Sequence, residues 1–289
     1  FEFAAENDVP MAAKARVLMQ AFLGVNLKCA RCHDDPHRDY LQRDLFQVAA
    51  MLKRSDQEVP ATSSIPSDSH AAESLIVKVT LKPGEKVAPQ WPFENLCDRS
   101  LPSGLLRNKA DSRELLAALI TSPTNSRFAQ TIVNRMWQFY LGRGLVDPVD
   151  NWDGEVPSHP ELLEFLAREL ILHQYDLKHV ARLILNSHTY QRAPAAAGED
   201  FVDGSYRFAA PLQRKMRAEQ LVDSLFAISG KAFDSGPITL DPDGALPIKT
   251  ALNLGEPIRA WEFSSLSNER DRPSLAMPFT QPFVTILEA

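Results

Sequence analysis

Two cysteines and a histidine lie within five residues, in the segment Cys-Ala-Arg-Cys-His at residues 29–33. A Cys-x-x-Cys spacing places the two sulfurs about one helical turn apart, which suits thioether bonds to the two vinyl groups of a haem. The histidine that follows directly can then reach the iron beneath the ring. The segment therefore predicts a c-type haem bound covalently to Cys29 and Cys32, with His33 as the proximal iron ligand.

The ligand on the opposite face of this haem is harder to choose from sequence. Met51 is our choice, because its thioether lies on a predicted helix that could fold over the haem. Met19 and His70 are alternatives, and an open or water-bound position is another. His37 follows His33 by four residues and stays on the same side of the ring. The sequence therefore predicts Met51 as the distal ligand and leaves the other options open.

Three other interpretations of the cysteine pair stay open. The pair and His37 have finger-like zinc spacing, with His33 or His70 as a fourth ligand, although adjacent cysteine and histidine ligands strain a tetrahedral site. A redox dithiol normally sits at a helix start after a strand, whereas this pair follows a predicted helix. The two thiols could also simply pack in a core. Cys97, the third cysteine, is expected to be a buried or partly buried bystander.

Three other groups of polar residues could form binding sites. Four acidic residues around Trp152 could bind a cation or a sugar, but a solvated loop is the preferred interpretation; they are Asp147, Asp150, Asp153 and Glu155. The sequence Gly142-Arg143-Gly144 is interpreted as a helix C-cap with a solvated arginine, in preference to an anion-binding loop. Three histidines share no spacing that suggests a metal site: His173, His179 and His188.

The apolar periodicity predicts a mainly α-helical protein with bundle-like domains, a haem segment and one small β-hairpin. The helices are expected at residues 11–24, about 40–53, 112–119, 127–141, 162–172, 177–187 and 217–229. The hairpin is expected over residues 74–90, where apolar residues alternate around a Pro-Gly turn. In the 127–141 helix, Asn134 and Arg135 are expected to hold a neighbouring turn, and Trp137 is expected in the core.

The first two helices carry few large apolar side chains, which indicates a thin core that a porphyrin would complete. On their inner faces we expect, among others, Leu18, Phe22, Leu41, Leu45 and Phe46. The formal net charge is −6, and lysines and arginines are scattered among carboxylates, so no nucleic-acid surface is expected. No apolar run approaches the roughly 20 residues that a membrane-spanning helix needs.

Several dispersed motifs together resemble planctomycete-type proteins in which a cytochrome-c-like domain is followed by an associated domain of unknown function. Residues 22–34 resemble the haem segment of the first domain. Motifs of the second domain follow in order: Leu119–Asn125, Val133–Trp137, Gly142–Val146, His159–Leu163, Arg217–Asp223 and Asn268–Ser274. The His-Pro that follows the family's haem motif is replaced here by Asp35-Pro36, so Asp35 cannot supply the family's histidine.

The resemblance implies that this chain is a fragment of a larger protein. It implies a cytochrome-c-like segment at 1–72, a hairpin and linker at 73–108, and a helical domain of unknown function at 109–289. It also implies an exported protein, periplasmic or on the cell surface. The haem motif, in a sequence where no other catalytic constellation stands out, predicts electron transfer or redox sensing with a redox partner protein. Alternatives are a peroxidase-like enzyme acting on peroxide or a small or carbohydrate substrate, and a structural subunit of a larger redox assembly.

Overall fold

The computed structural model is mainly helical, as predicted. The structure describes residues 11–60, 78–97, 101–102, 104–194, 201–202, 205–216, 218–232, 239–240, 252–253 and 259. Contacts divide the chain into two compact units, one formed by Glu2–Gln213 and the other by Phe1 with Arg214–Ala289. Within the described parts, no helix has both the length and the apolar character needed to cross a membrane.

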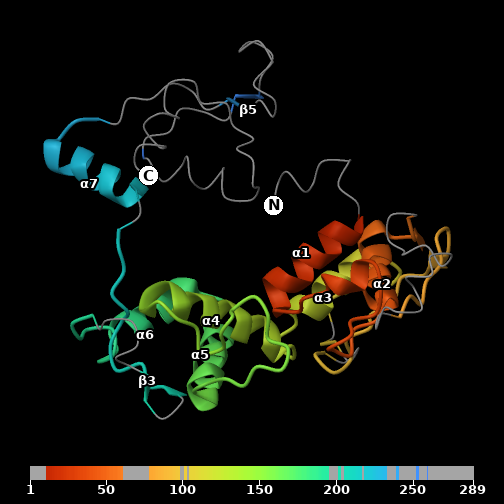
Figure 1. The fold of residues 1–289 in the computed structure, drawn as a ribbon, viewed down its shortest axis with the longest axis horizontal. Coiled ribbons are helices and arrows are strands. Elements are labelled where there is room, and N and C mark those ends of the chain that lie inside the picture. Colours follow the sequence, from red (N-terminus) through yellow and green to blue (C-terminus); the bar gives the residue numbers. More distant parts are fainter. Residues whose placement is uncertain are drawn as a thin grey trace. The chain divides into compact units, whose positions relative to one another are not determined.

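One group of helices in the larger unit includes the cysteine motif, and Figure 1 shows its helices α1, α2 and α3 together. It comprises α1 (Met11–Leu23), the short 3-10 turn η2 (Cys29–Arg31), α2 (Gln42–Lys53) and α3 (Ser112–Thr121). Helix α2 packs against α1, η2 and α3. Helix α1 ends at Gly24, whose φ of +64° suits glycine, and α3 begins where the Asp111 side chain accepts hydrogen bonds from two backbone amides.

The core of this group is closed by the protein's own side chains, so the expectation of a thin core is wrong. Helix α1 fully buries Ala15, Met19 and Leu23. Of the predicted face, Leu18 is partly buried against this core, whereas Phe22 is 38% exposed. Leu45 and Phe46 of α2 are fully buried as predicted, but Leu41 lies outside the helix as its N-cap and is 47% exposed. The missing apolar area comes from residues later in the chain: Leu81, Val87, Trp91, Phe93, Cys97, Leu116, Leu119 and Ile120.

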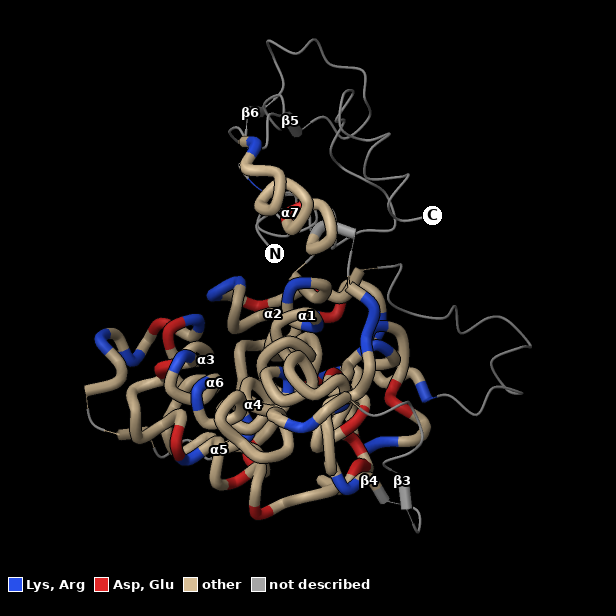
Figure 2. Tube along the Cα trace, turned by 90° about the vertical axis from the view of Figure 1, so that its left-hand side faces the viewer, with Lys and Arg blue, Asp and Glu red and all other residues tan. Residues whose placement is uncertain are grey.

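A second group of helices has its own core in the same unit. It comprises α4 (Ser126–Leu141), α5 (Pro160–Leu172) and α6 (Leu177–Leu185), which pack against one another, while α4 also contacts α1. Proline occupies the first turn of α5, and the Asp176 side chain caps α6 by accepting from the backbone N–H of Lys178. Figure 2 shows Lys and Arg interspersed with Asp and Glu along the described chain, in agreement with the sequence.

The structure describes only the second part of the predicted hairpin, and there a strand pairs with an earlier segment of the chain. Strand β2 (Lys86–Val87) pairs antiparallel with β1 (Gln57–Glu58), and Val59 donates its N–H to the carbonyl of Glu85 at 2.9 Å. Residues 61–77, which include most of the expected first strand, lie outside the described residues. Alternating side chains indicate a strand but carry no information about its partner, and the partner of β2 precedes residues 61–77 in the sequence.

Two further strand pairs are described. Strand β3 (Phe201–Val202) pairs with β4 (Ser205–Tyr206) in the larger unit. In the smaller unit, β5 (Thr239–Leu240) pairs with β6 (Leu252–Asn253), and α7 spans Ala218–Ser229. Helix α7 confirms the helix expected at 217–229 to within one residue, whereas the two strand pairs were not predicted.

Candidate functional site

The cysteine motif forms one tight turn on the surface of the first helical group. The backbone N–H groups of Cys32 and His33 both donate to the carbonyl of Cys29, at 3.0 and 3.2 Å. Ala30 is fully buried and anchors the turn, while Cys29 and Cys32 are partly exposed and neither forms a disulfide. The turn therefore presents two free thiols, with a histidine directly after them, at the edge of a closed core.

The imidazole of His33 has a defined tautomer. Its Nδ1 lies 2.7 Å from the backbone oxygen of Asp34. Because a carbonyl oxygen can only accept a hydrogen bond, Nδ1 must carry a proton and donate it. In the neutral ring this leaves the lone pair on Nε2, which is the state that a metal-ligating histidine needs, and the carbonyl fixes the ring orientation.

Burial, followed by the charge of Asp35 and a hydrogen bond to its carboxylate, raises the pKa of the Cys29 thiol. This environment disfavours the thiolate form of Cys29, which a zinc site requires. Within the described part of the chain, no three of Cys29, Cys32, His33 and His37 bring donor atoms within reach of one ion. His70, the remaining zinc candidate, lies outside the described residues.

Two buried aspartates shape the loop that follows the motif. The Asp34 carboxylate accepts hydrogen bonds from the backbone N–H of Gln42 and the hydroxyl of Thr80, both at 2.8 Å. Asp35 accepts from the backbone N–H of His37 at 3.0 Å, and its side chain is 2% exposed. Asp35 thus fills a structural position at the place where the resembled family has histidine.

The structure does not favour Met51 as a distal ligand. Asp34 directly follows His33, and its carboxylate accepts a hydrogen bond from Gln42, the first residue of α2. Met51 lies nine residues further along α2, about 13 Å from Gln42 at 1.5 Å per residue. Met51 and Met19 are both buried in the core, at 1% and 0% exposure. The distal ligand therefore stays a prediction.

The loop after the motif is tied to the acidic loop around Trp152. Arg38 lies between two carboxylates, with NH1 3.3 Å from Asp35 Oδ2 and Nε 3.5 Å from Asp153 Oδ2. The Tyr40 hydroxyl donates to Asp153 Oδ1. Burial, together with that hydrogen bond, raises the pKa of Tyr40 well above its ordinary value. A continuous polar network therefore runs from Asp35 through Arg38 and Asp153 to Tyr40.

The acidic loop also closes the end of α1. The backbone N–H of Trp152 donates to the carbonyl of Gly24 at 3.0 Å, and the indole lies directly against the Gly24 Cα. The guanidinium of Arg127, on α4, lies 4.6 Å from the centroid of the Trp152 ring. Loss of solvation on burial lowers the pKa of Arg127, opposed by the nearby Tyr40 and Asp153.

The interpretation of this acidic loop as simply solvated is wrong for Asp153, whereas Asp147 and Asp150 are partly or largely exposed and form ion pairs at the surface. Asp153 is 13% exposed and lies in the network described above. Asp150 pairs with Arg135 at 2.8 Å, and Asp147 pairs with Arg143 at 3.1 Å. Three arginines from different elements therefore compensate the charge of the loop.

The expected role of the α4 polar pair is confirmed. Asn134 is fully buried and bonds both backbone groups of Val146, donating from Nδ2 at 2.8 Å and accepting at Oδ1 at 3.0 Å. Arg135 also donates to the carbonyl of Gln20 at 3.1 Å, and Trp137 is buried as predicted. Gly142 caps α4 in the left-handed conformation, which confirms the C-cap. Arg143 is not simply solvated as expected, because it pairs with Asp147 and lies 3.9 Å from the centroid of the Tyr206 ring.

Comparison with family models finds two matches along the chain. Residues 112–281 match the model PSD1, described as a protein of unknown function (DUF1553), over more than half of the chain. The chain belongs to the PSD1 family. Residues 4–57 match PSCyt2, also described as a protein of unknown function (DUF1549). No curated protein and no solved structure matches the chain.

The two matches show the family partnership suggested by the resemblance, as two domains of unknown function. The PSCyt2 match includes the cysteine motif and α2, and the PSD1 match begins at the first residue of α3. Asp35, Arg38 and Tyr40 belong to the first match, and Asp153 belongs to the second. The network therefore joins the PSCyt2 segment to the PSD1 segment inside one compact unit.

One cluster was missed by the sequence analysis. The structure brings His173 and His179 together with Glu169, although the spacing of the histidines in the sequence does not suggest a metal site. The Glu169 to His173 separation of four residues places both on one helix face and could have drawn attention to the pair. The approach of His179 depends on the turn between α5 and α6, which spacing does not reveal. His188 is not part of this cluster.

Proposed function

We propose that Cys29 and Cys32 hold a c-type haem through thioether bonds, that His33 Nε2 ligates its iron, and that the protein acts in electron transfer or redox sensing. The observation that carries the proposal is the His33 tautomer, with Nδ1 donating to the Asp34 carbonyl and Nε2 left free beside two unpaired, partly exposed thiols. When bound, the haem would supply a one-electron centre.

The surroundings of Cys29 favour a thioether over a metal thiolate. A thioether sulfur is uncharged and can lie beside the buried Asp35 carboxylate, whereas a thiolate there would face a like charge. Asp34 and Asp35 hold the backbone that follows His33 through the hydrogen bonds to Gln42 and His37. These contacts would keep the proximal histidine in place when the iron changes charge.

The family resemblance supports the setting proposed for this chemistry, which is an exported compartment and a redox partner protein. A second function, binding of peroxide or another small ligand at the iron, is favoured by one observation. Met51 is buried in the core near the end of α2, whereas Asp34, next to His33, contacts the first residue of α2. A haem without a strong distal ligand leaves a position where such a molecule can bind.

The test is production of the full chain together with haem-maturation machinery. We expect covalent haem that stays with the polypeptide on a denaturing gel, and an α-band after dithionite reduction. Cys29→Ala/Cys32→Ala should abolish covalent attachment, whereas Cys97→Ala, at the third and buried cysteine, should retain it. Absence of haem from the parent chain, or equal haem content in the double variant, would overturn the proposal.

Two further measurements test the proximal ligand and separate the two functions. In a His33→Gly variant that keeps both thioethers, added imidazole should restore the parent spectrum if His33 is the iron ligand. Cyanide addition to the ferric parent then reports the distal position. Rapid binding supports small-ligand chemistry, and a low-spin spectrum that ignores cyanide supports electron transfer alone.

A further inference from the structure

The link between α5 and α6 has an unusual backbone. His173 directly follows the last residue of α5, and Asp176 caps α6 three residues later. The two residues between them, Gln174 and Tyr175, have φ values of +54° and +62°. Two consecutive non-glycine residues in the left-handed region are uncommon and cost free energy. This turn folds α6 back so that its first turn faces the end of α5.

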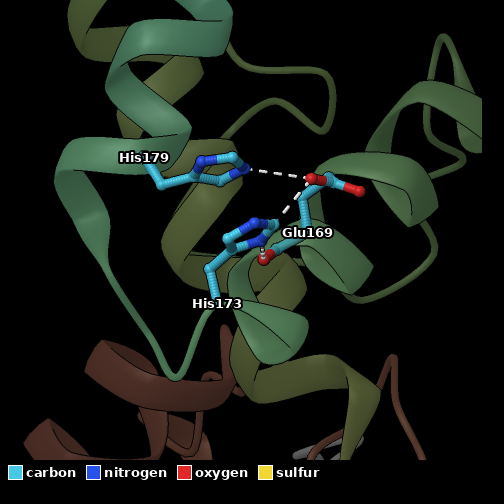
Figure 3. A group of neighbouring side chains, drawn as sticks. All are labelled: Glu169, His173 and His179. Atoms are coloured by element: carbon cyan, nitrogen blue, oxygen red, sulfur yellow. Dashed lines mark hydrogen bonds and ion pairs between the residues drawn. The ribbon is translucent and has the colours of Figure 1, made fainter.

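The turn brings three ligand-type side chains together (Figure 3). His179 Nε2 lies 3.0 Å from Glu169 Oε2, and His173 Nδ1 lies 3.6 Å from the same oxygen. The two imidazole rings stack with centroids 3.5 Å apart and planes inclined by 16°. All three donor atoms lie within 4.8 Å of one another.

These distances suit a small ion. Zinc binds imidazole nitrogen and carboxylate oxygen at about 2.0–2.1 Å, so donor atoms around a tetrahedral ion lie roughly 3.3 Å apart. The two measured separations from Glu169 Oε2 lie on either side of this value. Two imidazoles and one carboxylate leave a further coordination position for water. Such a donor set suits zinc and related transition metals better than magnesium or calcium, which prefer oxygen ligands.

The side chains have the freedom that binding would need. His173 Nδ1 donates to the Glu169 backbone carbonyl at 3.0 Å when no ion is present, so its proton must move to Nε2. The stacked rings must also tilt apart, because an ion lies in the plane of each ring that it binds. The His173 side chain is 46% exposed and has room to tilt. The Glu169 and His179 side chains are only 20% and 24% exposed, so their positions are more restricted.

We propose that Glu169, His173 and His179 form a binding site for a divalent transition-metal ion of the zinc class. The site lies on α5, the following turn and α6, and it uses no residue of the cysteine motif. It is therefore independent of the proposed haem, and either proposal can fail without the other. A bound ion would join the two helices across their strained connection.

The test is a calorimetric titration of the metal-stripped full chain with zinc sulfate. Free thiols at Cys29 and Cys32 could also bind zinc, so the titration uses Cys29→Ala/Cys32→Ala as the parent. We expect one zinc ion per chain, and no binding of magnesium at the same concentration. His179→Ala should weaken zinc binding at least about 10-fold. His188→Ala, an exposed histidine outside the cluster, should bind zinc as the parent does.

Two additional readouts keep the result unambiguous. Circular dichroism checks that each variant is folded. Glu169→Gln, which preserves side-chain size, is titrated as a second variant of the site. NMR of the histidine ring protons should show zinc shifting His173 and His179 as their rings unstack, without shifting His188. Unchanged zinc affinity in both His179→Ala and Glu169→Gln, or magnesium binding equal to zinc binding, would refute the site.

Discussion

The contact between Gly24 and Trp152 can be tested by adding one methyl group. Gly24 ends α1 with φ of +64°, and a Cβ at this position would overlap Trp152 Cδ1 and lie 2.9 Å from Cγ. The left-handed backbone alone costs a non-glycine residue about 1–2 kcal/mol. Displacing a buried indole adds about 1–3 kcal/mol, as in other overpacked cores. We therefore expect Gly24→Ala to lower the free energy of unfolding by about 2–5 kcal/mol.

A matched control separates the two contributions. Gly84 has φ of +81°, but a Cβ there would have no atom within 4 Å. Gly84→Ala should therefore lose only the backbone part, about 1–2 kcal/mol. Urea unfolding of both variants, followed by circular dichroism, gives the difference, which we expect to be about 1–3 kcal/mol.

The same substitution in a Trp152→Ala background completes the test. With the indole removed, Gly24→Ala should cost no more than Gly84→Ala does in the parent, because the steric part has been eliminated. This double-mutant cycle measures the coupling between the two positions directly. An equal loss from Gly24→Ala in both backgrounds would show that Trp152 does not close the end of α1.

Three further predictions follow from other contacts. The raised pKa of Tyr40 favours the neutral phenol in the folded state, so its stabilisation is present below pH 10 and is lost as the pH rises above it. Tyr40→Phe should cost roughly 1–2 kcal/mol at pH 8 in urea unfolding and a smaller amount at about pH 10.5; an equal cost at both would contradict the network. Asn134→Ala leaves both backbone groups of Val146 without their partner, and should cost about 2–4 kcal/mol in the same assay. An Asn186→Ala control, which loses an exposed bond to Arg182, should cost less. Because the first core is closed without a porphyrin, Cys29→Ala/Cys32→Ala should keep α1 and α2 as protected from hydrogen exchange as in the parent; loss of protection there would restore the thin-core expectation.

The helices were predictable because their signals are local. Asp111 before α3, Pro160 at the start of α5 and Gly24 after α1 each act within one turn of their own position. The predicted bounds accordingly agree with the structure to within about two residues at most ends. The cysteine motif was visible for the same reason, since five consecutive residues contain the whole pattern.

The features that the sequence did not reveal depend on contacts between distant residues. Phe22 was expected in the buried face of α1, but it is partly exposed and packs against Phe128 on α4. Apolar periodicity within α1 cannot indicate this contact with another helix. Similarly, Asp153 appeared to be solvated because its partners, Arg38 and Tyr40, lie more than 110 residues earlier in the chain. The cost of burying a carboxylate favours a paired position, but only the tertiary fold shows which cation and which hydroxyl are near.

The contacts of Asp153 also indicate how the two matched segments depend on each other. Asp35 is nearly inaccessible and, among the residues that the structure describes, pairs with Arg38, which it shares with Asp153. Removing Asp153 would leave Arg38 and Asp35 as an isolated pair and Tyr40 without its acceptor, next to the backbone that orients His33. The PSD1 segment therefore supplies part of the polar support of the PSCyt2 motif. A redox centre at Cys29 and Cys32 would thus be electrostatically coupled to the PSD1 segment through Asp35, Arg38 and Asp153.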